Sequence, residues 1–327
     1  MCSHKKIGDK VRLVVAGAGT FGQEHLRTLT RIEDVELVGV ADLNAVTAKR
    51  SAELYSATRW SVNATELVDE LRPDGLIVAT PGDTHVALAT CALSLGISVL
   101  VEKPVAPTMA QADLLARAER TSEAFALPGH ILRFSDPHRT FVQIARSDEI
   151  GPILSVTARR HRDESHALRY PDIDPMLMTM IHDIDLAVWI TEAKAAEVFA
   201  IRSPAGLQRS QTFVTARDSK GAAWHLATAW TFPGEAPADR IEVVGERGSV
   251  ELEVGSHIRQ HGAVTRQIDL PQAAALDEPL RIELSYFVHC IRFAERPRVV
   301  TLRDAINGLA VAEAAIASLQ TGAGVRP

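Results

Sequence analysis

The alternation of strand-like and helix-like segments over the first 120 residues constrains the fold most. The strand-like runs are apolar and rich in β-branched residues, and they lie at 11–19, 36–41, 75–79 and 97–101. The helix-like segments between and after them lie at 20–32, 45–54, 65–71, 84–95 and 108–120. Such an alternation predicts a doubly wound parallel sheet, which is an α/β fold.

Three glycines stand between the first strand-like run and the first helix-like segment. Gly17 permits a tight turn, Gly19 lets the backbone approach a pyrophosphate, and Gly22 lets the helix pack closely on the strand. The N–H groups at the start of a helix also attract phosphate. We therefore expect this loop, with Thr20 and Phe21 inside it, to bind a dinucleotide.

Asp42 ends the second strand-like run, twenty residues after Gly22. A carboxylate at this place binds both ribose hydroxyls of an adenosine and repels a 2′-phosphate. The next residue is Leu43 rather than an arginine that could bind that phosphate. The sequence therefore favours NAD over NADP, and a helix N-cap for 45–54 is the alternative role of Asp42.

Two further strand-like runs end in residues that we expect at the nicotinamide half of the cofactor. Thr80 and Pro81 follow the third run, and Glu102 and Lys103 follow the fourth. Ligands of doubly wound sheets lie at the carboxyl ends of the strands. His85, close behind Thr80, is predicted to belong to the same cofactor-binding set.

Composition and charge exclude several classes of protein. The 327 residues, typical of two domains, carry 35 basic and 41 acidic side chains, a net charge of −6. The longest basic cluster is 159–162, which argues against a surface for nucleic acid or anionic membranes. The three cysteines are far apart, the first ten residues contain no apolar leader, and no apolar run approaches the ~20 residues of a membrane span. We expect a cytoplasmic protein without a bound metal.

Motifs along almost the whole chain resemble those of the Gfo/Idh/MocA family of NAD(P)-dependent oxidoreductases, which includes glucose–fructose oxidoreductase and inositol dehydrogenase. The matching motifs are GAGTFG at 17–22, VAD at 40–42, ATPGDTHVALA at 79–89, LVEKP at 100–104, GHILRFSDP at 129–137, IGPI at 150–153, IHDIDLAVWI at 181–190, IEVVGERGSVEL at 241–252 and DAINGLAVAEAAIASLQTG at 304–322. They occur in the family's order, and the EKP and HDxD pieces are more specific than the glycine fingerprint.

The resemblance implies two domains. A Rossmann domain at 1–127 would precede a substrate-binding and oligomerisation domain at 128–327, built on a large, open, mostly antiparallel sheet. The sequence pattern agrees in part, because short β-rich segments recur at 152–161, 195–203, 209–217, 222–232, 240–245 and 248–254. The exposed sheet of the family implies a homodimer or a homotetramer.

The resemblance also implies the chemistry. Family members usually oxidise a secondary alcohol of a sugar or polyol and pass a hydride to nicotinamide. Because the alcohol loses a proton as its carbon loses hydride, a positioned acid/base is needed. By resemblance, Lys103 is the principal acid/base and His182 supports it.

One departure from the family pattern concerns His182. Asp174 and Pro175 predict the start of a helix that runs to about residue 190 and places Met178 and His182 on one side. The family usually has aspartate at the position of Met178, and a thioether cannot relay a proton. The methionines around it are better explained as core filler than as a cofactor site.

Three interpretations of this departure remain open. His182 is oriented by Asp185, by Asp183 or by another element. Alternatively, it only binds a substrate hydroxyl while Lys103 transfers the proton. In the third interpretation the site has lost dehydrogenase chemistry.

Four side chains are candidates for substrate contact, and the arginines among them have a structural role as the alternative. Arg160 and Arg162 share one face of a predicted strand and suit a carboxylate or phosphate, although a solvated strand edge explains them as well. Arg133 and Asp185 are the other two, and 163–173 is predicted to be a loop over the site. The leading hypothesis is an NAD-dependent dehydrogenase of a sugar, polyol or sugar derivative. The alternatives are a catalytically silent NAD-binding sensor and an NAD-dependent glycosidase.

Overall fold

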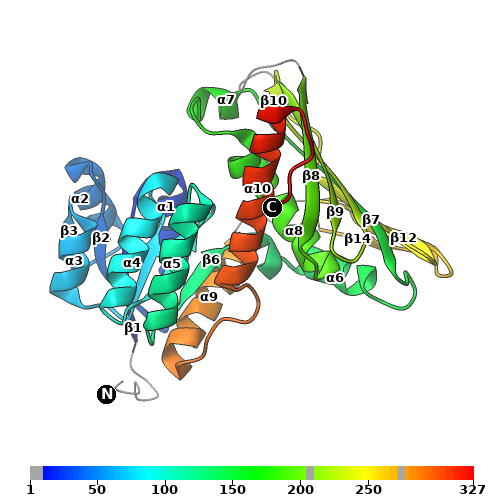
Figure 1. Ribbon diagram of the computed structural model, residues 1–327. Coiled ribbons are helices and arrows are strands. Elements are labelled where there is room, and N and C mark those ends of the chain that lie inside the picture. The colour runs from blue at the N-terminus through cyan, green and yellow to red at the C-terminus, as the bar shows by residue number, and fades with distance from the viewer. Residues whose placement is uncertain (1–9, 204–209, 272–276) are drawn as a thin grey trace. The chain divides into compact units, whose positions relative to one another are not determined.

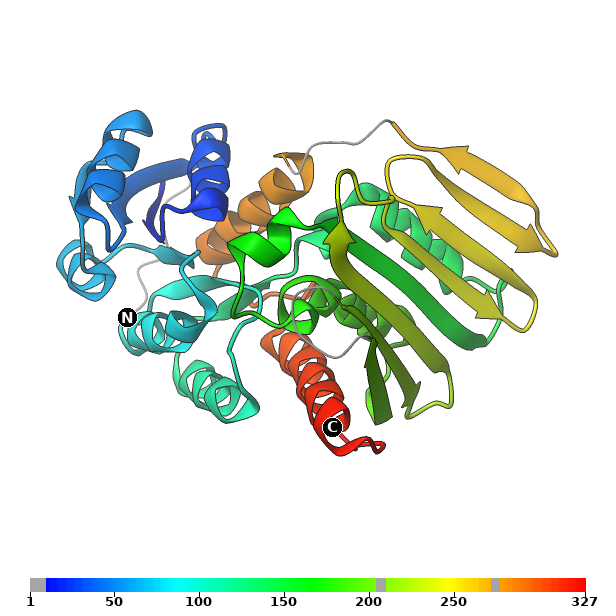
Figure 2. The ribbon, with the colours of Figure 1, turned by 90° about the horizontal axis from the view of Figure 1, so that it is seen from above.

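The computed structural model describes residues 10–203, 210–271 and 277–327, and the chain divides into two compact units (Figures 1 and 2). The first unit contains the described residues up to Phe134 and the segment that ends at Ala305. The second contains the described residues between Ser135 and Pro271 together with Ile306–Pro327. The expected division between 127 and 128 has one boundary, whereas here a late segment of the chain returns to the first unit.

The first unit has the parallel sheet that the sequence predicts. Its strand order is β3-β2-β1-β4-β5-β6, and every neighbouring pair is parallel. The strands are β1 Val11–Ala16, β2 Val35–Ala41, β3 Arg59–Ser61, β4 Gly75–Val78, β5 Ser98–Glu102 and β6 Ala126–Gly129. The helices are α1 Thr20–Leu29, α2 Ala45–Leu54, α3 Ala64–Leu71, α4 His85–Ser94, α5 Met109–Thr121 and α9 Asp277–Phe293, with short 3₁₀ turns η1 Gly82–Thr84 and η2 Ile131–Phe134.

The strand order of the first unit locates its ligand crevice. The order reverses between β1 and β4, so the helices that follow these two strands lie on opposite faces of the sheet. The glycine turn follows β1 and Thr80 follows β4, and both therefore border the crevice at the carboxyl ends of the strands.

Helix α9 belongs to the first unit because its apolar face completes that unit's core. Leu280, Leu284, Phe287 and Val288 are buried in the same hydrophobic cluster as the apolar residues of β1 and α1. The ring of Phe287 meets that of Phe125 edge-on, with centroids 5.9 Å apart. This apolar stripe accounts for the return of the chain.

The second unit has the large open sheet that the resemblance implies. Its strand order is β14-β13-β12-β11-β7-β10-β9-β8, and all neighbouring pairs are antiparallel except β7 with β10. The strands are β7 Ile153–Asp163, β8 Ala195–Ser203, β9 Gln211–Asp218, β10 Ala223–Phe232, β11 Arg240–Gly245, β12 Gly248–Glu253, β13 His257–Gly262 and β14 Arg266–Asp269. All six β-rich segments of the sequence correspond to strands; position 209 of the third lies outside the described residues. β13 and β14 were not predicted.

The two faces of this sheet differ. Helices α6 (Asp136–Ala145) and α8 (Ile181–Thr191) contact it from one side (Figure 1). The remaining helical segments of the unit are α7 Ser165–Arg169, the π-helical turn Met176–Met180 and α10 Leu302–Thr321, which begins in the first unit. Strand β9 alternates between buried and exposed residues, as expected for a sheet with one covered face. In the described part of the chain, no helix is both long and apolar enough to cross a membrane.

Candidate functional site

The glycine turn after β1 fits a dinucleotide. Gly17 has φ +91°, and a Cβ there would lie 2.4 Å from the carbonyl oxygen of Ala79. A Cβ on Gly22 would lie 2.0 Å from the carbonyl oxygen of Gly17. Both glycines are therefore required by the packing of the turn itself. A Cβ on Gly19, in contrast, would meet no heavy atom within 4 Å, so the space beside Gly19 is open for a ligand such as a pyrophosphate.

The start of helix α1 faces the same turn. The helix begins at Thr20, with Gly19 as its N-cap, and no side chain caps its first N–H groups. These donors and the positive end of the helix dipole are suited to bind an anion. Thr20 is exposed, and the ring of Phe21 packs edge-on against His25 with centroids 5.0 Å apart.

Asp42 connects the end of β2 to the glycine turn. Its Oδ2 accepts a hydrogen bond of 2.8 Å from the N–H of Ala18, and its Oδ1 accepts one of 2.9 Å from the N–H of Asn44. The cap of helix α2 is Asn44, whose side chain accepts from Val46 and Thr47. Because a carboxylate has about four lone pairs, Asp42 keeps acceptor capacity for two hydroxyl groups.

His85 holds two strand ends together. It is buried, and its Nε2 lies 2.8 Å from the carbonyl oxygen of Thr80, while its Nδ1 lies 2.8 Å from that of Pro104. The hydroxyl of Thr84 donates to the side chain of Thr80 at 2.7 Å. His85 was expected among the cofactor contacts, and its hydrogen bonds here go to backbone groups of the loops after β4 and β5.

Glu102 and Lys103 lie at the end of β5, and the peptide bond between Lys103 and Pro104 is cis. The carboxylate of Glu102 is buried inside the first unit. Its Oε1 lies 2.8 Å from Nε2 of His25, and its Oε2 accepts a hydrogen bond of 3.3 Å from the N–H of Lys103. Glu102 was expected to bind the cofactor. Here its carboxylate supports the backbone of Lys103 from within the unit.

Sequence reasoning missed Glu283, which lies on α9. Its side chain is completely buried, and neither carboxyl oxygen has a hydrogen-bond partner. Burial, together with the negative charge of Glu102, raises the pKa of Glu283 well above its usual value. A signal was available, because Phe287 lies four residues further on and shares the apolar side of the helix.

Arg133 lies in the 3₁₀ turn after β6 and is buried. Its Nη1 donates to the carbonyl oxygen of Val299 at 3.1 Å and approaches Oδ2 of Asp304 at 3.4 Å. These contacts join η2 to the late segment of the first unit. They correspond to the structural alternative that the sequence left open for Arg133.

The helix that carries His182 is not a regular α-helix throughout. Oδ1 of Asp174 accepts a hydrogen bond of 2.9 Å from the N–H of Met176, so Asp174 caps the segment as expected. Met176–Met180 then forms a π-helical turn, and α8 begins only at Ile181. Because hydrogen bonds in a π-helix run from i to i+5, Met178 and His182 do not have the stacking that four-residue spacing predicts for an α-helix. Met176 and Met180 are core residues.

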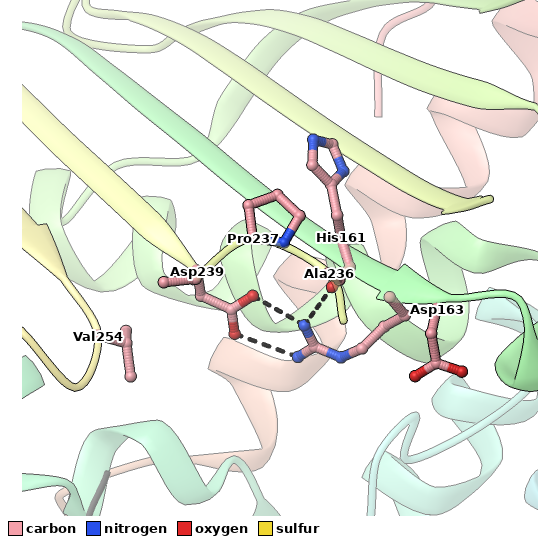
Figure 3. Close-up of a pocket in the computed structure, with 8 residues that line it drawn as sticks. His161, Asp163, Ala236, Pro237, Asp239 and Val254 are labelled. Atoms are coloured by element: carbon pink, nitrogen blue, oxygen red, sulfur yellow. Dashed lines mark hydrogen bonds and ion pairs between the residues drawn. The ribbon is translucent and has the colours of Figure 1, made fainter. Parts of the chain in front are cut away.

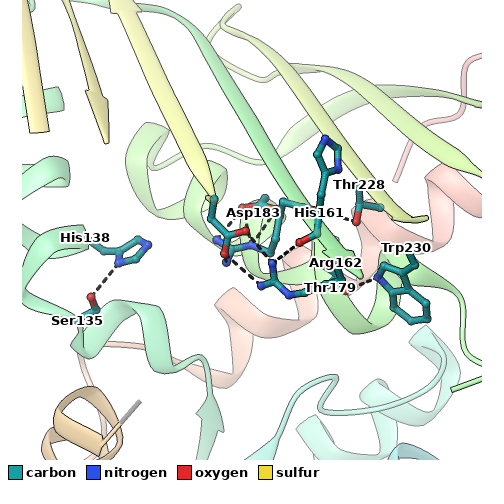
Figure 4. Close-up of polar contacts among 10 residues, drawn as sticks. Ser135, His138, His161, Arg162, Thr179, Asp183, Thr228 and Trp230 are labelled. Atoms are coloured by element: carbon teal, nitrogen blue, oxygen red, sulfur yellow. Dashed lines mark hydrogen bonds and ion pairs between the residues drawn. The ribbon is translucent and has the colours of Figure 1, made fainter. Parts of the chain in front are cut away.

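Arg160 and Arg162 pair with aspartates of the second unit (Figure 4). The guanidinium of Arg160 contacts both oxygens of Asp183, with Nε–Oδ1 at 3.0 Å and Nε–Oδ2 at 3.1 Å, and its Nη1 bonds Asp239. Arg162 bonds the two oxygens of Asp239 at 2.8 and 3.1 Å. Both arginines were candidates for a substrate carboxylate or phosphate, with a solvated strand edge as the alternative. Their observed acceptors are carboxylates of the protein.

The electrostatics of these four residues follow from burial and charge balance. Burial raises the pKa of Asp183 against the opposing effect of Arg160. For Asp239, burial is outweighed by Arg160 and Arg162, which lower its pKa. For Arg160, burial is outweighed by the two carboxylates, which raise its pKa. Two cations and two anions therefore form a balanced network, which we call the arginine–aspartate cluster.

Two histidines adjoin the arginine–aspartate cluster. Nδ1 of His138, on α6, lies 2.8 Å from Oγ of Ser135. Burial, followed by the positive charge of Arg160, lowers the pKa of His138 to about 3. His161 stacks on Phe232 with centroids 5.4 Å apart, and burial and nearby arginines lower its pKa as well. Both imidazoles are therefore neutral at pH 7.

A shallow pocket of about 340 Å³ opens at the end of β7 (Figure 3). It is lined by His161, Arg162, Asp163, Ala236, Pro237, Ala238, Asp239 and Val254. A hydrogen bond from Ser165 lowers the pKa of Asp163, so a negative carboxylate lies beside the neutral imidazole. The lining therefore offers hydrogen-bond acceptors to a polar ligand.

The remaining candidates lie in their own units. Lys103 is half-buried in the first unit, His182 is half-buried at the start of α8 in the second, and Asp185 is buried one turn further on. In the described ranges, no group of three or more His, Cys, Asp or Glu side chains is arranged to hold a metal ion.

Comparisons with known proteins agree with this architecture. Residues 11–130 match the model of the Gfo/Idh/MocA oxidoreductase family, NAD-binding Rossmann fold, and residues 138–251 match the C-terminal domain of the same family. Inositol 2-dehydrogenase 2 of Paenarthrobacter aurescens is 28% identical over 331 residues, which cover 95% of this chain and 96% of that protein.

Two solved structures have the same fold. Myo-inositol 2-dehydrogenase from Lactobacillus plantarum has a TM-score of 0.86 at 20% identity, covering 97% of this chain and 99% of that one. GenD2 from gentamicin A biosynthesis, solved in complex with NAD, has a TM-score of 0.84 at 21% identity, covering 100% and 99%. With both domains matched in order, the chain belongs to the Gfo/Idh/MocA family and is an NAD-binding oxidoreductase.

Proposed function

We propose that the protein is an NAD-dependent dehydrogenase that transfers a hydride between nicotinamide and a secondary alcohol of a sugar, polyol or sugar derivative. The observation that carries this proposal is the dinucleotide turn, in which the space beside Gly19 is open while Gly17 and Gly22 are fixed by packing. The relatives named inositol 2-dehydrogenase support a polyol as substrate. Bound NAD supplies the hydride acceptor.

The preference for NAD over NADP is part of this proposal. Asp42 presents a carboxylate with remaining acceptor capacity at the end of β2. Leu43, which follows it, is 90% exposed and offers no positive charge to a 2′-phosphate. We expect the Kd for NAD to be lower than that for NADP. Asp42→Ala should reduce the ratio of the Kd for NADP to the Kd for NAD.

Lys103 and His182 share the proton chemistry in this proposal. Lys103, whose backbone is supported by Glu102, takes the proton of the alcohol as hydride leaves the adjacent carbon. His182, at the start of α8, supports this proton transfer. In the reverse direction the two residues return the proton.

The test is NADH formation by purified protein. NAD⁺ is offered with a panel of inositols, aldoses, sugar acids and nucleotide sugars at mildly alkaline pH. With an active substrate identified, Lys103→Ala should lower kcat/KM by ~10²–10⁴-fold while the Kd for NAD changes little. Lys194→Ala, at an exposed lysine of the second unit, is the matched control. Turnover that survives Lys103→Ala unchanged would contradict the assigned role.

Other outcomes of the same panel point to the alternatives. NAD binding without turnover on any substrate favours a silent sensor, for which Met178 within the π-helical turn is the structural motive. An aryl glycoside added to the panel tests the other alternative, because release of its aryl group without net NADH favours a glycosidase.

We also propose that the open sheet face forms a homodimer or homotetramer. Three large apolar side chains of this face are exposed, namely Phe199, Ile201 and Phe213. They are neighbours, because Ile201 pairs with Phe213 across β8 and β9. Light scattering should show more than one chain per particle, and Phe213→Glu should shift the protein toward the monomer.

A further inference from the structure

The first turn of α8 is attached to strand β7 through one side chain. Asp183, directly after His182, is buried and contacts Arg160 through three N–O distances: 3.0 and 3.1 Å from Nε and 3.0 Å from Nη2. The two residues are 23 positions apart, so this contact fixes helix to sheet rather than one turn to the next.

Arg160 is itself held in place. Its strand pairs on both sides, with β10 and with β11, and its carbonyl oxygen accepts a hydrogen bond of 2.8 Å from the hydroxyl of Thr228. Asp239, just before β11, bonds the other end of the guanidinium. The planar guanidinium therefore lies between two carboxylates and has little freedom to turn.

A second attachment lies on the other side of His182. Nε1 of Trp230 on β10 donates to Oγ1 of Thr179 at 2.8 Å, and both side chains are buried. Thr179 belongs to the π-helical turn, where a regular α-helical ladder is absent. The sheet thus holds the chain three residues before His182 and one residue after it.

The direction of the His182 side chain depends on these attachments. Successive residues of an α-helix are rotated by about 100° about the helix axis. A helix start that is fixed at Asp183 has a fixed rotation, so the direction in which the preceding residue points is fixed as well. The half-buried imidazole therefore points where the anchored first turn directs it.

We propose that Arg160 is a positioning residue for His182, acting through Asp183 with Asp239 as its second support. The inference rests on the proposed function, in which His182 supports the proton transfer. A buried ion pair is weak evidence for stability, because well-packed apolar residues often replace one without loss. A role in fixing geometry explains why four charged side chains occupy this position.

The test removes one pair and leaves the other balanced. In the double variant Arg160→Met/Asp183→Leu, Arg162 and Asp239 remain as a neutral pair. The matched comparison, Arg162→Met/Asp239→Leu, removes the second support of Arg160 and leaves Arg160 and Asp183 as the neutral pair. Full-length protein labelled with ¹⁵N-histidine is titrated by NMR, with His182 assigned from the spectrum of His182→Gln.

We expect the first double variant to change the tautomer populations and titration midpoint of His182. The second variant keeps the contact between Arg160 and Asp183, so it should change them less. With an active substrate, the first variant should lower kcat ~10-fold or more with a smaller change in KM. Arg160→Lys keeps the positive charge but not the bidentate geometry, so its kcat should lie between those of the double variant and the wild type. It replaces the double variant in the test if that variant does not fold.

The two proposals fail in distinguishable ways. A lower Tm with an unchanged His182 titration and unchanged kcat would overturn the positioning role and leave a purely structural pair. Wild-type protein that forms no NADH would count against the proposed function, while the NMR comparison would still decide whether Arg160 sets the environment of His182.

Discussion

Each unit buries the carboxylate that is adjacent in sequence to a candidate acid/base residue. Glu102 precedes Lys103 in the first unit, and Asp183 follows His182 in the second. The partners of the two carboxylates differ, because Glu102 meets His25 whereas Asp183 meets Arg160. In both cases a buried carboxylate supports the backbone next to a candidate acid/base side chain that remains partly accessible.

The two clusters also differ in how they balance charge. The arginine–aspartate cluster pairs the guanidinium groups of two arginines with the carboxyl groups of two aspartates. In the first unit the second acid, Glu283, is buried near Glu102 without a hydrogen-bond partner. Keeping its proton is the remaining way to avoid a second buried negative charge. Burial of carboxyl groups is thus accompanied by pairing with arginine in the second unit and by a raised pKa in the first.

The largest effect should come from breaking the charge balance of the second unit. Arg160→Met leaves Asp183 and Asp239 buried, with Arg162 as the one remaining cation of the cluster. Removing one partner of a buried pair typically costs about 3–5 kcal/mol. Urea unfolding at pH 7 should show a loss of that size. Arg160→Met/Asp183→Leu should recover most of it, and a single variant as stable as the double would contradict the balance described here.

The next effect should appear in acid and involves His138. The pKa of His138 is lowered to about 3, whereas an unfolded histidine titrates near ~6.5. The unfolded chain therefore binds a proton first, and stability is lost as the pH falls from about 6.5 toward 3. By pH 5 the loss amounts to about 2 kcal/mol. Arg160 and Asp239 are the charged groups that act on this imidazole.

The measurement compares wild type with His138→Gln, which stays neutral and can still bond Ser135. The difference in free energy of unfolding between the two proteins should change by about 2 kcal/mol between pH 7 and pH 5. A difference that does not depend on pH would show that His138 is not held neutral.

The contribution of Glu283 to stability should have the opposite pH dependence to that of His138, because it is lost as the pH rises. Its raised pKa means that the folded state keeps a proton that the unfolded state has lost. Its contribution is fully present below the unfolded pKa and is lost as the pH rises through the folded pKa. Glu283→Gln mimics the protonated form, so its Tm should exceed that of wild type increasingly as the pH rises.

The expected gain for Glu283→Gln grows between the unfolded and the folded pKa of Glu283, by up to about 1.4 kcal/mol for each pH unit. Thermal unfolding from pH 5 to pH 9 would measure it. If Glu283→Gln is less stable than wild type at every pH, the folded state does not favour the protonated form of Glu283.

The sequence predicted the elements well because periodicity is a local signal. The alternation of β-like and helix-like runs gave the parallel sheet, and six β-rich segments gave six strands of the second sheet. The glycine spacing predicted a turn in which Gly17 and Gly22 are indeed fixed by packing. The π-helical turn was missed, because MLMTM at 176–180 does not distinguish it from an α-helix.

The partners of the buried charges could not be predicted in the same way. Alternation placed Arg160 and Arg162 on one face, but their shared acceptor Asp239 lies 77 or more positions further along the chain. Glu283 meets Glu102 only because α9 returns to the first unit. Such pairings depend on tertiary structure, to which local pattern gives no access.

The smallest effect should come from an exposed ion pair on the helix that also carries Glu283. Glu278 bonds Arg281 one turn later, with Oε1 2.7 Å from Nη2, and both side chains are about half exposed. The arginine lowers the pKa of Glu278, but solvent screens the pair. Glu278→Gln should therefore cost only about 0.3–0.5 kcal/mol, and 1 M salt should abolish most of the difference. A loss above about 1 kcal/mol that persists in salt would contradict this expectation. Exposed charges on α9 would then contribute as much to the free energy of unfolding as its buried acid, whatever their burial.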